Sequence, residues 1–159
     1  INPPFLGVKM LTFTDASFDD KNKIAGIGIA IYDGMKWHTK SLWVKCRTIN
    51  EAELCAIHIG SILAERKGRF FTDSQTAISY IKNEIKDKPR SREQYINHKH
   101  CLFYAYQIRR RGILPEKVKA HQNNYQPLSI GNRLADVLAA DGRSKFYMQI
   151  KQNQNRKER

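Results

Sequence analysis

The chain alternates between short runs of β-forming residues and longer stretches with helical spacing. After an irregular lead-in over residues 1–7, where two prolines disfavour regular structure, β-rich runs follow at 8–17, 24–32 and 36–45. Polar turns separate these runs, and Asp33-Gly34 is the strongest turn signal among them. Consecutive strands joined by such short turns are typical of hairpins. The first third of the chain therefore predicts three antiparallel strands.

The remainder of the chain alternates helix and strand. The pattern predicts helices at 50–67, 74–86, 93–111 and from about 132 to 142 or beyond, strands at 69–73 and 113–120, a polar break at 87–92 and a loop at 121–130. This order predicts an α/β fold, with a mixed five-stranded sheet flanked by helices. We expect a single domain over 8–145, followed by a basic, frayed tail over 146–159.

Composition restricts the class of protein and its partners. The 159 residues are 41% hydrophobic and 27% charged, which suits one soluble globular domain. Lys and Arg number 28 against 15 Asp and Glu, and the net charge of +13 indicates a polyanionic partner. Cys46, Cys55 and Cys101 form no CxxC pair, so we expect reduced core thiols. Without a membrane-spanning run or a secretion signal, we expect a cytoplasmic, nuclear or virion-associated location.

Four carboxylates on well-formed local patterns carry the candidate chemistry. They are Asp15 in LTFTDAS, Glu53 in INEAEL, Asp73 in FFTDSQ and Asp136 in GNRLAD. Two follow β-rich runs and two lie near the start of helical runs, which would gather them at one edge of a sheet. Bare carboxylates that share a small space raise one another's pKa. Divalent cations relieve that repulsion, and two of them can clamp a phosphodiester. The pattern points to metal-dependent cleavage of nucleic acid.

Each carboxylate also has a local structural interpretation. Asp15 could be a turn residue, and Asp73 could cap the helix that follows it. Asp136 could interact favourably with the dipole of the last helix. None of these acids is convincing alone, and the metal interpretation rests on the four together.

Two capping boxes compete at the start of the first helix. Thr48 with Glu51 and Asn50 with Glu53 both have the required spacing. Glu51 and Glu53 lie about 200° apart around a helix, so only one of them can face the sheet edge. Glu53 is favoured because its side of the helix carries small or apolar residues, namely Ile57, Gly60 and Ala64.

The order of TDAS, TINEAEL, FFTDSQ, KAHQ and GNRLAD resembles type 1 ribonuclease H, including the ribonuclease H domains of reverse transcriptases. The resemblance covers about residues 8–142. It implies a ribonuclease H-like fold and an enzyme that hydrolyses the RNA strand of RNA–DNA hybrids, leaving 5′-phosphate and 3′-hydroxyl ends. It also implies that Asp15, Glu53, Asp73 and Asp136 hold two Mg²⁺ ions, for which Mn²⁺ can substitute. His121 would assist proton transfer or product release.

The resemblance also indicates which residues contact the hybrid. They are hydrogen-bonding residues near the carboxylates: Ser17, Thr48, Asn50, Ser74, Gln75 and Asn132. Basic residues around the polar break could add phosphate contacts or could simply form a solvated helix end: Lys86, Lys88, Arg90, Arg92 and Lys99. Two departures from the family stand out. Ile49 replaces the usual amide residue and cannot hydrogen-bond a 2′-hydroxyl, which would relax the selection of hybrids. The basic segment after the second helix lacks the tryptophans that many members carry there.

Two other classes of protein remain as alternatives. A non-catalytic nucleic-acid-binding domain of the same fold would be recognised by a missing carboxylate, and none of the four is missing. A related integrase, resolvase or exonuclease is the second alternative. An exonuclease of this superfamily would carry Asp-x-Glu on the first strand, where this chain has Asp15-Ala16-Ser17. We expect a monomer, or a part of a larger polyprotein or polymerase.

Overall fold

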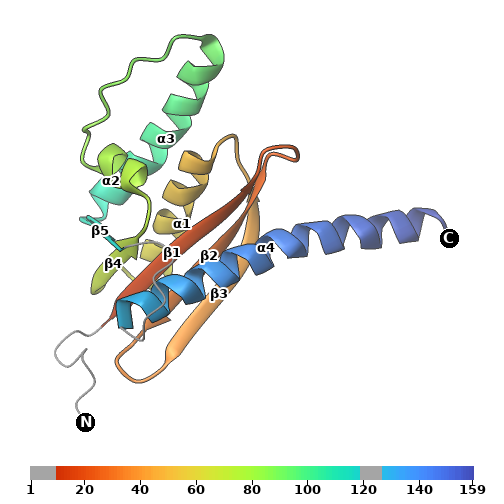
Figure 1. Ribbon diagram of the computed structural model, residues 1–159, viewed down its shortest axis with the longest axis horizontal. Coiled ribbons are helices and arrows are strands. Elements are labelled where there is room, and N and C mark those ends of the chain that lie inside the picture. The colour runs from red at the N-terminus through yellow and green to blue at the C-terminus, as the bar shows by residue number, and fades with distance from the viewer. Residues whose placement is uncertain (1–9, 119–126) are drawn as a thin grey trace.

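The computed structural model describes residues 10–118 and 127–159, and Figure 1 shows their arrangement. The elements follow in the order β1 (Leu11–Asp19), β2 (Ile24–Tyr32), β3 (Trp37–Lys45), α1 (Ile49–Leu63), β4 (Arg69–Thr72), α2 (Gln75–Ile81), α3 (Arg92–Arg110), β5 (Glu116–Lys117) and α4 (Pro127–Lys157). Within these residues, no helix is both long and apolar enough to span a bilayer. The predicted α/β class is confirmed.

The five strands form one mixed sheet in the order β3-β2-β1-β4-β5. Strands β1, β2 and β3 pair antiparallel through two short turns, and the Asp33 carboxylate accepts the backbone N–H groups of Met35 and Lys36 in the second turn. After α1 the chain returns as β4, which runs parallel to β1, and β5 runs parallel to β4. A crossover helix between β3 and β4 provides the length that such a return requires.

Helices cover both faces of the sheet. The side chains of β2 alternate between the faces, so Ile27, Ile29 and Ile31 join the core under α1, while Ala30 joins the core under α4. Helix α3 packs on α1 and α2 (Figure 1). All three cysteines are free and buried, in agreement with the expectation of reduced core thiols.

Two glycines let α4 lie directly on the backbone of β2. A Cβ atom at Gly26 would stand 1.9 Å from the Ala139 carbonyl oxygen, and one at Gly28 would stand 2.0 Å from that of Ala135. No side chain fits at either position. The G-x-G pattern of β2 therefore sets the distance between the sheet and α4.

The last helix is longer than the sequence predicts. It runs from Pro127 to Lys157, so residues 146–157 are helical rather than frayed. Gly142, taken as a possible end of the helix, is instead a contact point, because a Cβ there would lie 2.2 Å from the Leu42 carbonyl oxygen of β3. The next turn is held by an edge-to-face contact of Phe146 with Trp43 and by the Lys145 ammonium, which donates to the Ser41 carbonyl at 2.8 Å.

Other elements are shorter than predicted. Helix α2 ends at Ile81 rather than near residue 86, because Asn83 adopts a φ of 59° and the Arg109 guanidinium binds the carbonyls of Tyr80 and Ile81, at 3.1 Å each. Helix α1 ends at Leu63, before a left-handed pair of residues. The predicted strand 113–120 is described only up to residue 118, and within that part Glu116–Lys117 form β5.

Candidate metal centre

Strand register brings Asp15 and Asp73 together. Phe13 of β1 pairs with Phe71 of β4, and the two strands run parallel. Each aspartate lies two residues beyond this pair, at the point where β4 ends and β1 continues. Ser74, not Asp73, is the N-cap of α2, since its hydroxyl accepts the Ala77 N–H at 3.1 Å. The capping interpretation of Asp73 is therefore wrong.

The start of α1 resolves the choice between the two glutamates. Thr48 is the N-cap and its hydroxyl accepts the Glu51 N–H at 3.2 Å, while the Glu51 carboxylate accepts the Arg47 N–H at 3.1 Å. Glu51 also lies 2.7 Å from the Nδ1 atom of His100. With Glu51 occupied in this way, Glu53 is the residue that reaches the sheet edge.

Asp15, Glu53 and Asp73 form a compact carboxylate cluster. One oxygen from each lies within 4.8 Å of the others. Burial, then the charge of Asp73 and a hydrogen bond with Asp136, raise the pKa of Asp15 to about 8. Burial, then the charges of Asp15 and Asp73, raise the pKa of Glu53 to about 10.

The donor set of this cluster fits a divalent cation. Among the described residues, the buried Oε2 atom of Glu53 has no hydrogen-bond partner. A bound cation would supply that partner and remove the repulsion between the carboxylates. Carboxylate oxygens are also the ligands that Mg²⁺ and Mn²⁺ prefer. The cluster can therefore hold a metal ion.

Asp136 reaches the cluster from α4, which lies on the face of the sheet opposite α1. Gly28 makes this close approach possible. Gly28 pairs with Asp15 in the register of β1 and β2, and the Ala135 carbonyl occupies the space above it. Asp136 is the next residue of α4, and its hydrogen bond and its charge both raise the pKa of Asp15. It is exposed and lies outside the group of three. Asp136 thus stands at the open rim of the cluster.

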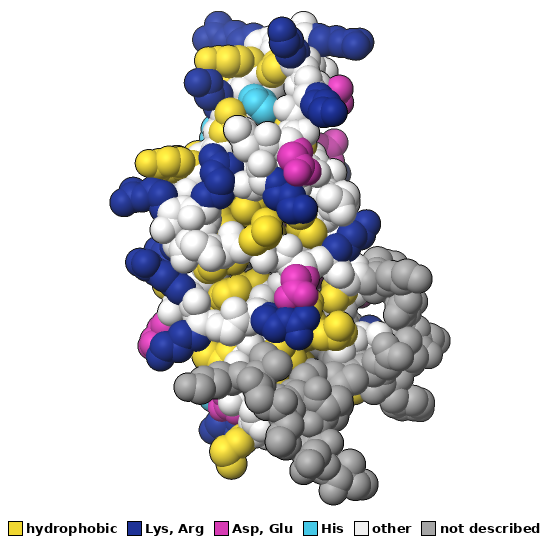
Figure 2. Space-filling view, turned by 90° about the vertical axis from the view of Figure 1, so that its left-hand side faces the viewer, with side chains coloured by type: hydrophobic (Ala, Val, Ile, Leu, Met, Phe, Trp, Pro, Cys, Tyr) yellow, Lys and Arg dark blue, Asp and Glu magenta, His cyan; other side chains and the backbone are white. Residues whose placement is uncertain are grey.

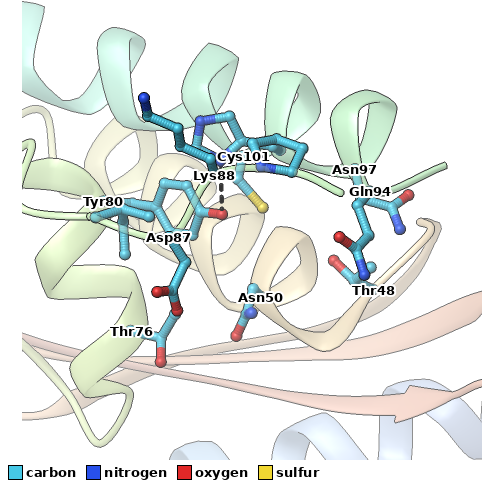
Figure 3. A pocket seen from close by; sticks show the side chains of 12 residues that line it. Thr48, Asn50, Thr76, Tyr80, Asp87, Lys88, Gln94, Asn97 and Cys101 are labelled. Carbon is cyan, nitrogen blue, oxygen red and sulfur yellow. Dashed lines mark hydrogen bonds between the residues drawn. The ribbon is translucent and has the colours of Figure 1, made fainter. Parts of the chain in front are cut away.

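A pocket of about 280 Å³ adjoins the same end of α1 (Figure 3). Thr48 and Asn50 contribute from α1, and Lys88 contributes from the segment between α2 and α3. The other polar side chains that line it are Thr76, Tyr80, Asp87, Gln94, Asn97 and His98. Asn50 precedes Glu53 by one helical turn, so the pocket and the cluster are neighbours.

The other predicted contact residues have different settings. Ser17 is half-buried on β1, and Asn132 of α4 is only 5% exposed. Gln75 is exposed in the first turn of α2, directly after Ser74. Lys86, Arg90 and Arg92 are exposed, and His121 lies outside the described residues.

Sequence reasoning missed the contribution of α3 to the pocket. His98 had no assigned role, yet it lines the pocket and its Nδ1 atom hydrogen-bonds the Tyr80 hydroxyl at 3.1 Å. A signal for this face exists in the sequence, because the pocket residues of α3 have helical spacing: Gln94, Asn97, His98 and Cys101.

Comparisons with solved structures identify the fold. The chain superimposes on ribonuclease H1 recovered from a compost metagenome with a TM-score of 0.62 and 18% identity, over 87% of this chain and 98% of that one. Ribonuclease H1 of the archaeon Halobacterium salinarum gives a TM-score of 0.57 and 14% identity, over 86% and 98%. The N-terminal RNase H domain of a Mycobacterium tuberculosis protein gives 0.50 and 21%, over 85% and 99%.

The amino-acid sequence was also compared with curated proteins and with protein families. A search of curated proteins found no match. The RNase H family, however, matches residues 8–144, a range that contains all four carboxylates and the residues that position them. The chain belongs to the RNase H family.

Proposed function

We propose that this protein is an endoribonuclease that cuts the RNA strand of RNA–DNA hybrids by two-metal-ion catalysis, leaving 5′-phosphate and 3′-hydroxyl ends. The observation that carries the proposal is the cluster of Asp15, Glu53 and Asp73, whose oxygens lie within 4.8 Å of one another. Such a cluster costs folding free energy unless cations occupy it. Its presence in a chain with a net charge of +13 supports a catalytic role on a polyanion.

In this proposal the four carboxylates hold two Mg²⁺ ions. When bound, the ions would neutralise charge on the scissile phosphate and lower the pKa of a water molecule. Asp15 and Glu53 are buried and held by the sheet and by α1, so they would position the ligand set. Asp136 is exposed at the rim, where it can adjust as substrate enters and leaves. His121 would move a proton or assist product release.

The pocket beside the cluster would hold a backbone phosphate of the strand that is not cut. Asn50 can donate from its amide. The Thr48 hydroxyl, which accepts the Glu51 N–H as the helix cap and hydrogen-bonds the Cys101 thiol, lines the same pocket. Lys88 contributes a positive charge to the same pocket, beside the negative charge of Asp87. Exposed cations of the neighbouring segment, Lys86, Arg90 and Arg92, would extend this contact with salt-dependent affinity.

Recognition of the RNA strand would fall to residues beside the carboxylates. Ser74 and Gln75 follow Asp73 directly, and Ser17 lies on β1 two residues beyond Asp15. Ile49, the first residue of α1, is 40% exposed. Its side chain has no donor or acceptor with which to hydrogen-bond a 2′-hydroxyl of the RNA strand. We therefore expect weaker discrimination between hybrid and duplex RNA than an amide at position 49 would give.

The decisive experiment is cleavage of end-labelled RNA–DNA hybrid, duplex RNA, duplex DNA and single-stranded RNA, each with Mg²⁺, Mn²⁺ or EDTA. We expect metal-dependent cutting of RNA in the hybrid and none of duplex DNA. Ile49→Asn provides the matched variant, and it should reduce cutting of duplex RNA relative to hybrid. Binding of hybrid without any cutting, in either metal, would make the protein a binding module and overturn the proposal.

A further inference from the structure

The outward face of α3 carries a continuous stripe of aromatic and basic side chains. Successive members are three or four residues apart, which places them on one side of the helix. We define this aromatic–basic stripe as Tyr95, Lys99, Phe103, Tyr106 and Arg110. The residues of α3 that are buried against the core, Cys101, Ala105 and Ile108, lie on the opposite side.

The rings of the stripe are unusually exposed for their size. Tyr95 is 51% exposed, Phe103 58% and Tyr106 52%. Most large aromatic side chains bury far more of their surface, and exposed apolar surface that is grouped together marks binding sites. The pocket next to the carboxylate cluster does not use these rings, because α3 contributes to it through Gln94, Asn97, His98 and Cys101. The stripe is therefore a separate surface.

The cations of the stripe are arranged around its rings. The Lys99 ammonium lies 5.2 Å from the centre of the Tyr95 ring, and the Arg110 guanidinium lies 5.8 Å from that of Tyr106. In the described part of the chain, no salt bridge involves Lys99 or Arg110. Glu93 is the only acid of α3 and lies about 120° around the helix from the stripe. Figure 2 shows one side of the molecule, on which Lys and Arg side chains lie among hydrophobic ones and outnumber Asp and Glu.

We propose that the aromatic–basic stripe is a second nucleic-acid contact that binds an unpaired strand. Base stacking on exposed rings, with cations beside the phosphates, is the usual way in which proteins hold single strands without reading their sequence. A duplex keeps its bases stacked inside, so it would use only the two cations and leave all three rings without a role. The stripe is about 22 Å long, enough for about six stacked nucleotides.

The stripe begins next to a residue that is proposed to contact the hybrid. Arg92, a proposed contact to the hybrid, begins α3 one turn before Tyr95. A strand that continues single-stranded beyond the hybrid could pass from Arg92 onto the stripe. The proposal does not rest on cleavage, because it predicts binding by the stripe whether or not the carboxylate cluster is active.

The test is fluorescence anisotropy with labelled oligothymidylate and oligouridylate in EDTA, on the full chain and on Tyr95→Ala/Phe103→Ala/Tyr106→Ala. Stacking on one ring is worth about tenfold in affinity, so the triple variant should lose at least about tenfold. Cleavage or binding of blunt-ended hybrid should be unchanged. The matched control, Leu114→Ala/Met148→Ala, removes exposed apolar side chains outside the stripe and should bind oligonucleotides as the wild type does.

A second variant tests the two cations of the stripe, and it keeps the proposal testable if the triple alanine variant does not fold. Lys99→Glu/Arg110→Glu should also bind oligonucleotides more weakly, and the salt dependence of that binding should decrease. The control, Lys151→Glu/Arg156→Glu on α4, should change the affinity and its salt dependence less. Three results would overturn the proposal: no binding by the wild type, equal binding by wild type and stripe variants, or equal loss for blunt hybrid and single strand. The first two would leave the stripe as a surface for a protein partner.

Discussion

The carboxylate cluster and the pocket beside it share the first turn of α1, yet they are built in different ways. The cluster depends on backbone geometry, through the pairing of β1 with β4 and the contact of Gly28 with α4. The pocket depends on side chains from α1, α2, α3 and the segment between the last two. Single side chains of the pocket can therefore change without disturbing the cluster. Catalysis and substrate selection should separate when each region is altered.

The largest effect is expected when one ligand of the cluster is removed. Asp73→Asn keeps the shape of the side chain and deletes its charge, so turnover should fall by at least about a hundredfold, the scale on which one preorganised charge-stabilising group acts. Thermal unfolding at about pH 5, where the carboxyl groups of the cluster are protonated, and hybrid binding in EDTA should stay close to wild type. Turnover like that of the wild type would remove Asp73 from the proposed ligand set.

A steric change beneath α4 should disturb the cluster through the backbone. Gly28→Ala places a Cβ atom 2.0 Å from the Ala135 carbonyl oxygen, so α4 must shift and Asp136 must move with it. We expect a loss of about 2–4 kcal/mol in unfolding free energy, measured by denaturant titration, together with reduced cleavage.

Gly112→Ala is the matched control for this substitution. A Cβ there meets nothing within 4 Å, so only the φ of 73° adds a cost, of about 1–2 kcal/mol. Cleavage by this variant should be normal. Equal losses of stability and activity in the two variants would show that the contact between Gly28 and α4 does not position Asp136.

The cluster should also make stability depend on pH in the metal-free protein. The pKa of Asp15 is raised to about 8 and that of Glu53 to about 10, whereas both ionise near pH 4 in an unfolded chain. Their contribution to stability is therefore complete below about pH 4 and declines as the pH rises towards the folded-state values. In EDTA, Tm should fall from about pH 5 to about pH 9 more steeply for wild type than for Asp73→Asn.

Mg²⁺ should reverse that loss most strongly at high pH, because the ligands bind metal only when deprotonated. Differential scanning fluorimetry of both proteins, with EDTA or with Mg²⁺, provides the comparison. If the slope is the same in both proteins and Mg²⁺ leaves Tm unchanged, the carboxylates do not form a coupled metal site.

The smallest effect is expected from a single change in the pocket. Lys88→Ala should weaken hybrid binding about two- to fivefold and lower the slope of log affinity against log salt by about one, while turnover of bound substrate is kept. Lys36→Ala, at the turn between β2 and β3, removes the same charge far from the pocket in the chain. A similar loss in both variants would indicate diffuse attraction rather than a phosphate contact at Lys88.

The residues of the cluster could be predicted because each lies on a local pattern. Asp15 and Asp73 follow β-rich runs, and parallel pairing of the two strands is enough to bring them together. Choosing Glu53 over Glu51 required only the angle between them around a helix. The N-cap of α2 was harder to predict, because Asp73 and Ser74 are both good capping residues and only the hydrogen bond from the Ala77 N–H to the Ser74 hydroxyl identifies the cap.

Features that depend on distant contacts could not be predicted. Gly142 has the local character of a helix end, and only its approach to the Leu42 carbonyl shows why a glycine stands inside α4. The end of α2 is determined partly by Arg109, which lies 28 residues after Ile81 in the chain. The pocket likewise joins residues of four segments, and no single segment carries a signal for it.

The length of α4 places its C-terminal end at a fixed distance from the carboxylate cluster. One uninterrupted helix carries both Asp136 and Lys157, and 21 residues at 1.5 Å each separate them by about 32 Å. A fluorophore or spin label near residue 157 would keep an almost constant separation from the carboxylates, since glycine contacts and the Trp43–Phe146 pair hold the helix to the sheet. Energy transfer from that point to either end of a labelled duplex would therefore report the direction in which substrate lies across the protein.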